Sequence, residues 1–179
     1  MIFSSRLSVV IIRIIDVIGY SGSGKTFFIM SALKLLKRKF DYNITVIKNV
    51  KHHQIDDKGK DSRLFTESGA SYSIIQNLNK DMAIFLNLKE VRLDDFIKWL
   101  TQGPYEIGII FTEGFRNLNH PTVLCASNVD EIKPQLTDNV KMISGIICGK
   151  GVNKRSILDI PIINIEQNFQ TFLEIFEII

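Results

Sequence analysis

The chain has 179 residues, of which 45% are hydrophobic and 23% are charged. This is the composition of an average globular protein, so it excludes an extended disordered chain and a collagen-like repeat. Lys and Arg number 22 against 19 Asp and Glu, and the net charge of +3 is too small to predict nucleic-acid binding. The length suits about one domain, and we predict a single domain over residues 1–179.

The cysteine content and the apolar N-terminal stretch are used here to predict the cellular compartment of the protein. Cys125 and Cys148 give neither a disulfide framework nor a metal-ligand spacing, which favours a reducing cytoplasm. The stretch 7–18 contains charged residues, is shorter than the ~20 residues of a membrane helix, and lacks the small-residue cleavage site of a signal peptide. We therefore expect a cytoplasmic protein without a membrane partner, in which residues 1–8 are a disordered extension or follow from a start codon assigned too early.

A strand, a glycine-rich loop and a helix follow one another near the N-terminus. The β-branched run 9–15, continued by Val17 and Ile18, predicts a strand buried on both faces. The apolar period of residues 28–39 predicts an amphipathic helix. Between them lies the motif of a phosphate-binding loop, which consists of Gly19, Tyr20, Ser21, Gly22, Ser23, Gly24, Lys25 and Thr26.

The residue types of this loop suit a phosphate chain bound with Mg²⁺. Glycine permits backbone conformations in which successive N–H groups converge on an anion, and the following helix adds the positive end of its dipole. Lys25 is predicted to reach the β and γ phosphates, and the Thr26 hydroxyl to ligate Mg²⁺. The alternatives are a glycine-rich turn without a ligand, which the flanking strand and helix disfavour, and a relic loop, which the intact Lys25 and Thr26 disfavour.

The remaining strand and helix patterns alternate along the chain. This alternation predicts an α/β fold of the P-loop NTPase type, with three layers (α/β/α) and a mostly parallel central sheet. Helices are expected at 62–68, 93–100 and 169–176. Strands are expected at 44–48, 72–76, 82–86, 107–112, 123–126, 143–147 and 162–165.

Glu113 is the second candidate for chemistry. It ends the hydrophobic run 107–112, and in phosphate-loop proteins an acidic residue at the end of a neighbouring strand acts on Mg²⁺ directly or through water. A strand that merely meets solvent at a charged residue is the alternative. In combination with the phosphate loop, the pattern predicts that Glu113 and Thr26 serve the same metal ion.

A polar segment after the second strand is the third candidate region. About fifteen residues without regular structure usually form a functional or a disordered loop, although composition alone favours a solvated surface loop. Its basic side chains are candidates to hold phosphates, and Asp57 or Asp61 to orient Mg²⁺ or a water. His52 and His53 lack further ligands at a known spacing, so they do not predict a metal site. The charged and histidine residues are Lys48, Lys51, His52, His53, Asp56, Asp57, Lys58, Lys60, Asp61 and Arg63.

The order and spacing of several motifs resemble the protein B family of molybdopterin-guanine dinucleotide biosynthesis. The phosphate loop is shared by a whole superfamily, whereas the motifs after it are far more specific in combination. The resemblance spans residues 11 to about 121. Beyond the phosphate loop, its motifs are Val46-Ile47-Lys48, His52-His53, Gly59-Lys60-Asp61-Ser62, Gly69-Ala70 and Glu113-Gly114-Phe115-Arg116.

The resemblance implies a cytoplasmic GTP-binding protein, usually a homodimer, that assists the guanylyltransferase which joins GMP to molybdopterin. It implies GTP and Mg²⁺ as ligands, slow GTP hydrolysis, the molybdopterin guanylyltransferase as partner, and molybdopterin as a further candidate partner. With the residue chemistry above, it gives catalytic, metal-binding and nucleotide-binding assignments. These are Lys25, Asp61 and Glu113 for catalysis; Thr26, Asp57 and Glu113 for the metal; and residues 19–26 with Lys48, Lys60, Ser62 and Arg116 for the nucleotide.

Guanine specificity and the type of activity are less well specified by the residues. Asn49 stands where the family usually has His, and Asn153-Lys154-Arg155-Ser156 lacks the Asp of a guanine-binding motif. The guanine preference therefore follows from the resemblance alone. A small-molecule kinase on the same fold is the alternative function, but it needs an acceptor pocket and usually an arginine-bearing lid. No paired-arginine lid is evident in the sequence.

Overall fold

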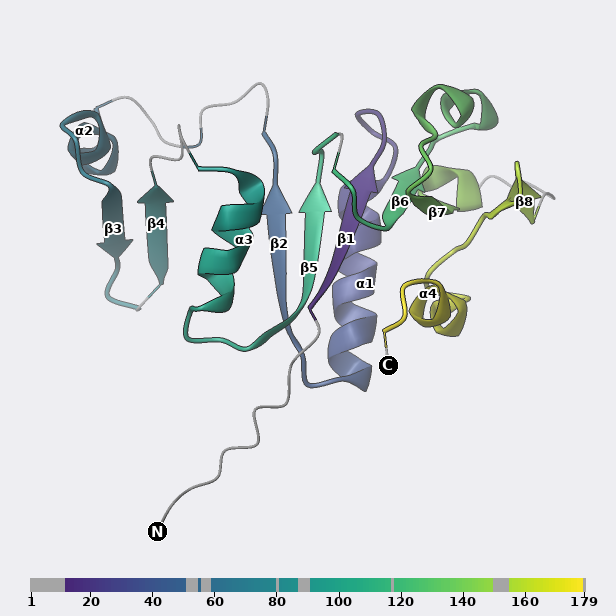
Figure 1. Ribbon diagram of the computed structural model, residues 1–179, viewed down its shortest axis with the longest axis horizontal. Coiled ribbons are helices and arrows are strands. Elements are labelled where there is room, and N and C mark those ends of the chain that lie inside the picture. The colour runs from purple at the N-terminus through teal and green to yellow at the C-terminus, as the bar shows by residue number, and fades with distance from the viewer. Residues whose placement is uncertain are drawn as a thin grey trace, which may run out of the picture. The chain divides into compact units, whose positions relative to one another are not determined.

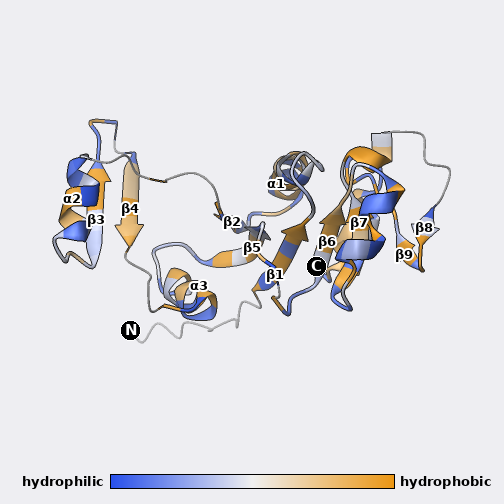
Figure 2. Cartoon of the chain, turned by 90° about the horizontal axis from the view of Figure 1, so that it is seen from above, coloured by the Kyte–Doolittle hydropathy of each residue, from blue (hydrophilic) through white to orange (hydrophobic). Residues whose placement is uncertain are grey.

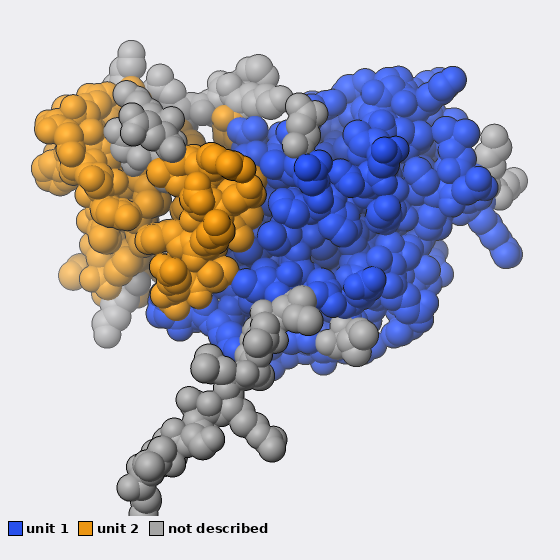
Figure 3. All heavy atoms as spheres, in the orientation of Figure 1, with its two compact units in different colours: residues 1–49, 104–179 blue, residues 50–103 orange. Residues whose placement is uncertain are grey.

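The computed structural model describes residues 12–50, 55, 59–79, 81–86, 91–116, 118–149 and 155–178. The chain forms two compact units, coloured separately in Figure 3. Unit 1 comprises Met1–Asn49 and Pro104–Ile179, and unit 2 comprises Val50–Gly103. Unit 2 is therefore an insertion in the sequence of unit 1. The predicted single domain over the whole chain stays a prediction.

Unit 1 is built on a five-stranded parallel sheet (Figure 1). Strands buried on both faces read as continuous apolar runs, and the interior strand β5 is buried at every position. The predicted α/β fold with a parallel central sheet is thereby confirmed. The strand order is β2 (Asn43–Lys48), β5 (Ile107–Glu113), β1 (Arg13–Ile18), β6 (Thr122–Cys125) and β7 (Val140–Ser144).

Apolar side chains form two clusters because successive residues of a strand point to opposite faces. Val123 and Cys125 of β6 join the larger cluster, which includes side chains of α1 (Lys25–Lys39) and α4 (Phe169–Ile175). Leu124, between them, joins the second cluster with Ile132 and Ile147. The short 3-10 helices η1 (Val129–Glu131), η2 (Lys133–Gln135) and η3 (Ile146–Gly149) lie in or next to the segments that supply this second cluster.

Helix α1 is long enough to cover the sheet behind the glycine-rich loop. Its buried side chains recur at helical spacing, and the ring of Phe28 meets that of Phe172 in α4 edge to face, with centroids 6.0 Å apart. Basic residues occupy its last turn, where they complement the negative end of the helix dipole. The helix begins at Lys25, three residues before the predicted start.

Two predicted strands of unit 1 differ from the structure. The apolar run 143–147 is divided: β7 ends at Ser144, and Gly145 at φ +94° turns the chain into η3. At 162–165 only Ile162 makes a single parallel bridge, to Ile143, while the preceding β8 (Ser156–Ile157) and β9 (Ile160–Pro161) form a small antiparallel pair. Short apolar runs do not distinguish a strand from a buried turn, which explains both errors.

Unit 2 contains a β-hairpin and two helices, all within a few residues of the predicted ranges. The ring of Trp99 stacks on Tyr72, with centroids 6.3 Å apart, so Trp99 contributes to packing within the unit. Figure 2 shows β4 as apolar along its length. The elements are α2 (Asp61–Glu67), β3 (Tyr72–Gln76), β4 (Met82–Leu86) and α3 (Leu93–Thr101), and β3 pairs with β4 in antiparallel register.

None of the helices in the described residues has the length and apolar character needed to cross a membrane.

Candidate functional site

The carboxyl ends of three parallel strands bring the predicted site residues of unit 1 together. The register sets Glu113, the last residue of β5, beside Val17 of β1 on one side and Lys48 of β2 on the other. Val17 lies just before the glycine-rich loop, so that loop and Glu113 share one edge of the sheet. Parallel strands thus position at one place residues that are far apart in the sequence.

The loop needs glycine at particular positions. Gly19 has φ +147°, and a Cβ atom there would collide with the backbone carbonyl of Cys125 and lie 2.5 Å from Ser23 Oγ. Gly24 has φ +94° and stands immediately before α1, with Ile146 N 3.2 Å from where its Cβ would be. Any side chain at Gly19 would displace the loop from β6, so the residue type follows from the packing.

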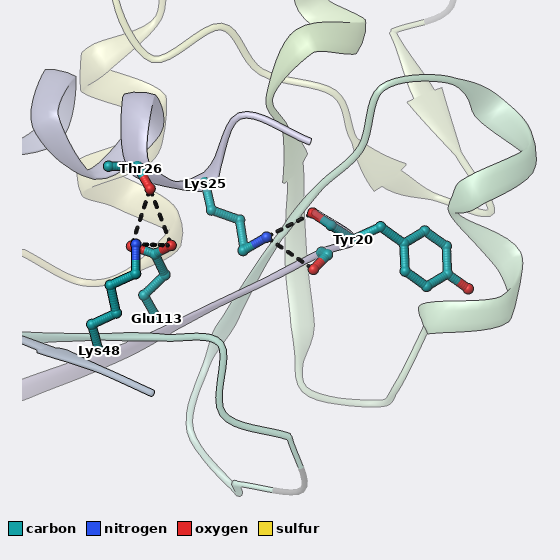
Figure 4. A network of polar contacts seen from close by, with 6 residues as sticks. Tyr20, Lys25, Thr26, Lys48 and Glu113 are labelled. Atoms are coloured by element: carbon teal, nitrogen blue, oxygen red, sulfur yellow. Dashed lines mark hydrogen bonds and ion pairs between the residues drawn. The ribbon is translucent and has the colours of Figure 1, made fainter. Parts of the chain in front are cut away.

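The ammonium group of Lys25 folds back over the loop. Its Nζ donates to the carbonyl oxygen of Gly19 at 3.0 Å and to that of Tyr20 at 2.7 Å (Figure 4). A positive charge is therefore held directly beside the backbone of the loop. This is the position from which a lysine can exchange carbonyl oxygens for the oxygens of a phosphate chain.

Thr26, Glu113 and Lys48 form a second polar group on the other side of Lys25 (Figure 4). Thr26 Oγ1 donates to Glu113, 3.1 Å from Oε1 and 3.3 Å from Oε2. Lys48 Nζ lies 3.1 Å from the same Oε1, and the Glu113 side chain is only 7% exposed. A buried carboxylate requires a cation, and in the structure the Lys48 ammonium supplies it.

The start of α1 has the properties of an anion site. The first N–H groups of any helix lack partners within the helix, and α1 has no side-chain cap and no acidic residue in its first turn. Ser23 Oγ, within the loop, is buried and has no hydrogen-bond partner among the described residues. Buried hydroxyls are normally satisfied, so these donors fit a phosphate group.

Arg116 follows β5 and reaches back to the loop. Its guanidinium carbon lies 5.9 Å from the centre of the Tyr20 ring, within the range of a cation–π contact. One of its terminal nitrogens, Nη2, donates to Gln135 Oε1 at a long 3.4 Å. Arg116 is therefore brought to the glycine-rich loop, and its predicted contact with a nucleotide stays a prediction.

The other predicted site residues belong to unit 2 or lie outside the described residues. Lys60 and Asp61 begin α2, Asp61 stands in its first turn, and Ser62 is 2% exposed. These three are described within unit 2. Asp57 lies outside the described residues, as do His52 and His53. Within the part of the chain that is described, no group of three or more His, Cys, Asp or Glu side chains could hold a metal ion.

The sequence reasoning missed a buried polar group on the sheet. Asp16 in β1 is 2% exposed, accepts a hydrogen bond from Thr112 Oγ1 at 2.5 Å, and has His120 Nδ1 3.3 Å from the same oxygen. The available signal was an acidic residue in the middle of the mostly apolar strand β1. Cys125, by contrast, is packed beneath the loop, and burial raises the pKa of its thiol, so it does not act as a nucleophile.

The site described above can be compared with known proteins. Residues 14–148 match the family described as "Molybdopterin guanine dinucleotide synthesis protein B". A "Putative molybdopterin-guanine dinucleotide biosynthesis adapter protein" of Methanocaldococcus jannaschii is 31% identical over 123 residues, covering 66% of this chain and 49% of that protein. A Haemophilus influenzae "Molybdopterin-guanine dinucleotide biosynthesis adapter protein" is 32% identical over 119 residues, covering 63% of this chain and 62% of its own length. The chain thus spans between about half and two thirds of these relatives.

Solved structures share the fold. The crystal structure of Bacillus subtilis MobB has a TM-score of 0.70 at 20% identity and covers 92% of this chain and 98% of that one. A MobB homologue from Bacillus stearothermophilus has a TM-score of 0.63 at 18% identity, with coverage of 90% and 94%. Identities this low establish the fold alone. Since the family match covers most of the chain, including the glycine-rich loop and Glu113, the chain belongs to the molybdopterin-guanine dinucleotide synthesis protein B family.

Proposed function

We propose that the protein is a GTP-binding adapter of molybdopterin-guanine dinucleotide biosynthesis that hydrolyses GTP slowly. The observation that carries the proposal is the convergence of Lys25, Thr26 and Glu113 at the end of the parallel sheet, at the open start of α1. Family membership and the names of the two relatives support the pathway. The proposed partner is the molybdopterin guanylyltransferase, with molybdopterin as a second candidate.

The residues of the loop account for phosphate binding. On binding, Lys25 would exchange two carbonyl oxygens for phosphate oxygens, so a charged contact replaces two neutral ones. Ser23 Oγ would gain the partner that it lacks among the described residues. The free N–H groups at the start of α1 would meet the anion along the helix dipole. Each change favours a bound phosphate chain, which makes the loop selective for anions.

Magnesium fits the group formed by Thr26 and Glu113. A hydroxyl and a carboxylate that already lie within hydrogen-bond distance are oxygen ligands of the kind that Mg²⁺ takes. The Lys48 ammonium stands beside the same carboxylate and would have to leave as the metal arrives, because both would neutralise one charge. When bound, the ion would neutralise charge on the β and γ phosphates. Lys48 would then be released toward the nucleotide, the role predicted for it.

Hydrolysis would depend on the same residues. Lys25 would stabilise charge on the phosphates, and Glu113 would orient the metal or a water. The catalytic role of Asp61, the metal-binding role of Asp57 and the nucleotide contacts of Lys60 and Ser62 stay predictions.

Calorimetric titration tests the nucleotide claim. With Mg²⁺ present, the protein should bind GTP more tightly than ATP, and Lys25→Ala should weaken GTP binding about tenfold to a hundredfold, because one charged hydrogen bond contributes about 1.5–3 kcal/mol. Lys34→Ala removes an equal charge from the exposed face of α1 and should leave affinity unchanged. Equal or tighter binding of ATP would contradict guanine preference. Unchanged affinity of Lys25→Ala would contradict the phosphate site itself.

A pull-down tests the partner. Immobilised protein should retain purified molybdopterin guanylyltransferase, and retention should differ between GTP and buffer alone. The immobilised Lys25→Ala variant should retain the same amount of transferase with GTP as with buffer alone. The variant itself should stay bound to the resin. Failure to retain the transferase in either condition would contradict the adapter role, while leaving the nucleotide claim to its own test.

A further inference from the structure

Helix α1 has apolar side chains on its exposed face as well as on its buried face. Phe28, Ala32 and Leu36 pack in the core of unit 1. Phe27 and Met30 are nevertheless 65% and 51% exposed. Residues three positions apart lie on the same face of a helix, so these two side chains adjoin each other on the side turned away from the core. An isolated apolar residue at a surface is ordinary, whereas adjoining ones indicate an interaction surface.

A third exposed apolar side chain stands at the same end of the helix. Ile146 is 43% exposed, and its backbone N–H donates to the Ser23 carbonyl at 3.2 Å. Its Cγ1 lies 3.4 Å from where a Cβ atom of Gly24 would be, and Gly24 immediately precedes α1. Phe27 directly follows Thr26, the candidate magnesium ligand. The apolar end of the exposed face is therefore continuous with the candidate nucleotide site.

The rest of the exposed face is basic. Lys34 follows Met30 at helical spacing, Lys37 and Arg38 stand one turn further on, and all three are exposed. Helix α1 contains no Asp or Glu in its 15 residues, whereas charges of both signs usually alternate along a solvated helix face. Among the described residues, Lys34 and Arg38 form no ion pair, and Lys37 meets Asp41 only at 4.0 Å. The face thus carries positive charge that the described carboxylates do not neutralise.

We propose that this face docks an acidic segment of a partner protein, whose apolar side chains cover Phe27 and Met30 while its carboxylates meet the basic residues. The inference rests on the proposed function, because the partner is the guanylyltransferase proposed there; the surface and the chemistry of its counterpart are new. Aromatic residues and methionine are enriched at interfaces, and opposite charges steer two proteins together. A second copy of the chain fits less well, because a two-fold pairing would bring basic residues near each other.

Binding of purified guanylyltransferase to the immobilised full chain tests the apolar part of the surface. Surface plasmon resonance is recorded with GTP and Mg²⁺ present. Phe27→Ala and Met30→Ala should each raise the dissociation constant at least about tenfold, because a few central anchors carry most of the energy of an interface. The matched control is Tyr105→Ala, which should leave the constant unchanged. Tyr105 is 67% exposed and precedes β5, so it lies at the other end of that strand from Glu113.

The association rate tests the basic part. Arg38→Glu should slow association severalfold at low salt and less at high salt, because exposed charges steer the encounter and salt screens them. Lys133→Glu reverses an exposed positive charge in η2 and should leave the rate unchanged. An unchanged rate in Arg38→Glu would contradict an acidic counterpart.

Two further readouts separate this inference from the proposed function. Calorimetry should give Phe27→Ala and Met30→Ala the GTP affinity of the unaltered chain, and thermal unfolding verifies that both are folded. The docking surface would be overturned by full transferase binding in either variant, by an equal loss in Tyr105→Ala, or by a loss in Met30→Ala that follows its GTP affinity. Those results would leave the adapter role standing. No transferase binding by the unaltered chain would instead contradict the adapter role, and the docking surface with it.

Discussion

The central sheet of unit 1 and the hairpin of unit 2 differ in how far they bury their apolar residues. Every residue of β5 is buried, whereas in β3 only Ser73 is buried and in β4 none is. A parallel sheet has apolar clusters to cover it, but a two-stranded ribbon has too few neighbours to bury both faces. Apolar content alone therefore does not identify the core, because the same residue types are buried in unit 1 and lie at the surface in unit 2.

An exposed apolar surface of this kind commonly marks an interaction site. Ile74 and Ile84 face each other across the hairpin and are 60% and 44% exposed. The family resemblance implies a homodimer, and we expect such a dimer to use this hairpin surface, because pairing two copies would cover side chains that one copy leaves in water.

The largest effect is expected on stability. Phe111→Ala in β5 should lower the free energy of unfolding by about 3–5 kcal/mol, because it leaves a cavity at a fully buried position. Ile84→Ala in the hairpin should cost a monomer less than about 1 kcal/mol, since surface changes are usually small. Urea unfolding followed by circular dichroism measures both. Equal losses would show that the hairpin is as well packed as the sheet.

The second effect is expected on GTP turnover, through one residue of each unit. Glu113→Gln should lower GTP turnover about a hundredfold while reducing nucleotide affinity less, because the amide retains shape but not charge. Glu106→Gln, at the other end of β5 and exposed, is the matched control and should keep turnover. In unit 2, Asp61→Asn should also lower GTP turnover. Single-turnover assays decide it, and normal turnover in Glu113→Gln would remove that residue from the mechanism.

The third effect is on assembly. Ile84→Glu places a charge on the exposed hairpin and should raise the dimer dissociation constant at least about tenfold, because an unpaired charge is costly to bury. Val129→Glu, at an exposed apolar position of unit 1, should leave the dimer intact. Light scattering across a dilution series measures the mass of both variants. If only Val129→Glu dissociates, the interface belongs to unit 1.

The smallest effect is on thiol reactivity inside unit 1. Burial raises the pKa of both Cys148 and Cys125, so the reactive thiolate forms only at higher pH than for a free thiol. Alkylation of Cys148, which is half-buried, should therefore be slow at neutral pH and accelerate as the pH rises. Cys125 is buried and should react only when unit 1 opens. Mass spectrometry of alkylated peptides follows the labelling of both cysteines. Faster labelling of Cys125 than of Cys148 would contradict the tight packing of the sheet.

Prediction from sequence succeeded where the signal is local. The hairpin strands were predicted at 72–76 and 82–86 and occupy those residues, because short runs rich in apolar residues, bounded by turn residues, are short-range features. The strand predicted at 143–147 was wrong in its second half, where Gly145 turns the chain. That turn depends on packing against Ser23, whose carbonyl a Cβ at Gly145 would meet, and no local pattern contains this information.

The glycine-rich loop, the helix after it and the acidic strand end could be predicted from local sequence, because each is a contiguous motif with its own backbone chemistry. Only the three-dimensional structure shows that Lys48 pairs with Glu113, that Asp16 meets Thr112 and His120, and that residues Val50–Gly103 form a unit of their own. The physical reason is that these relations arise from strand register and burial, which join residues distant in sequence. Thr26 and Glu113, 87 positions apart, meet only because β1 and β5 are parallel neighbours.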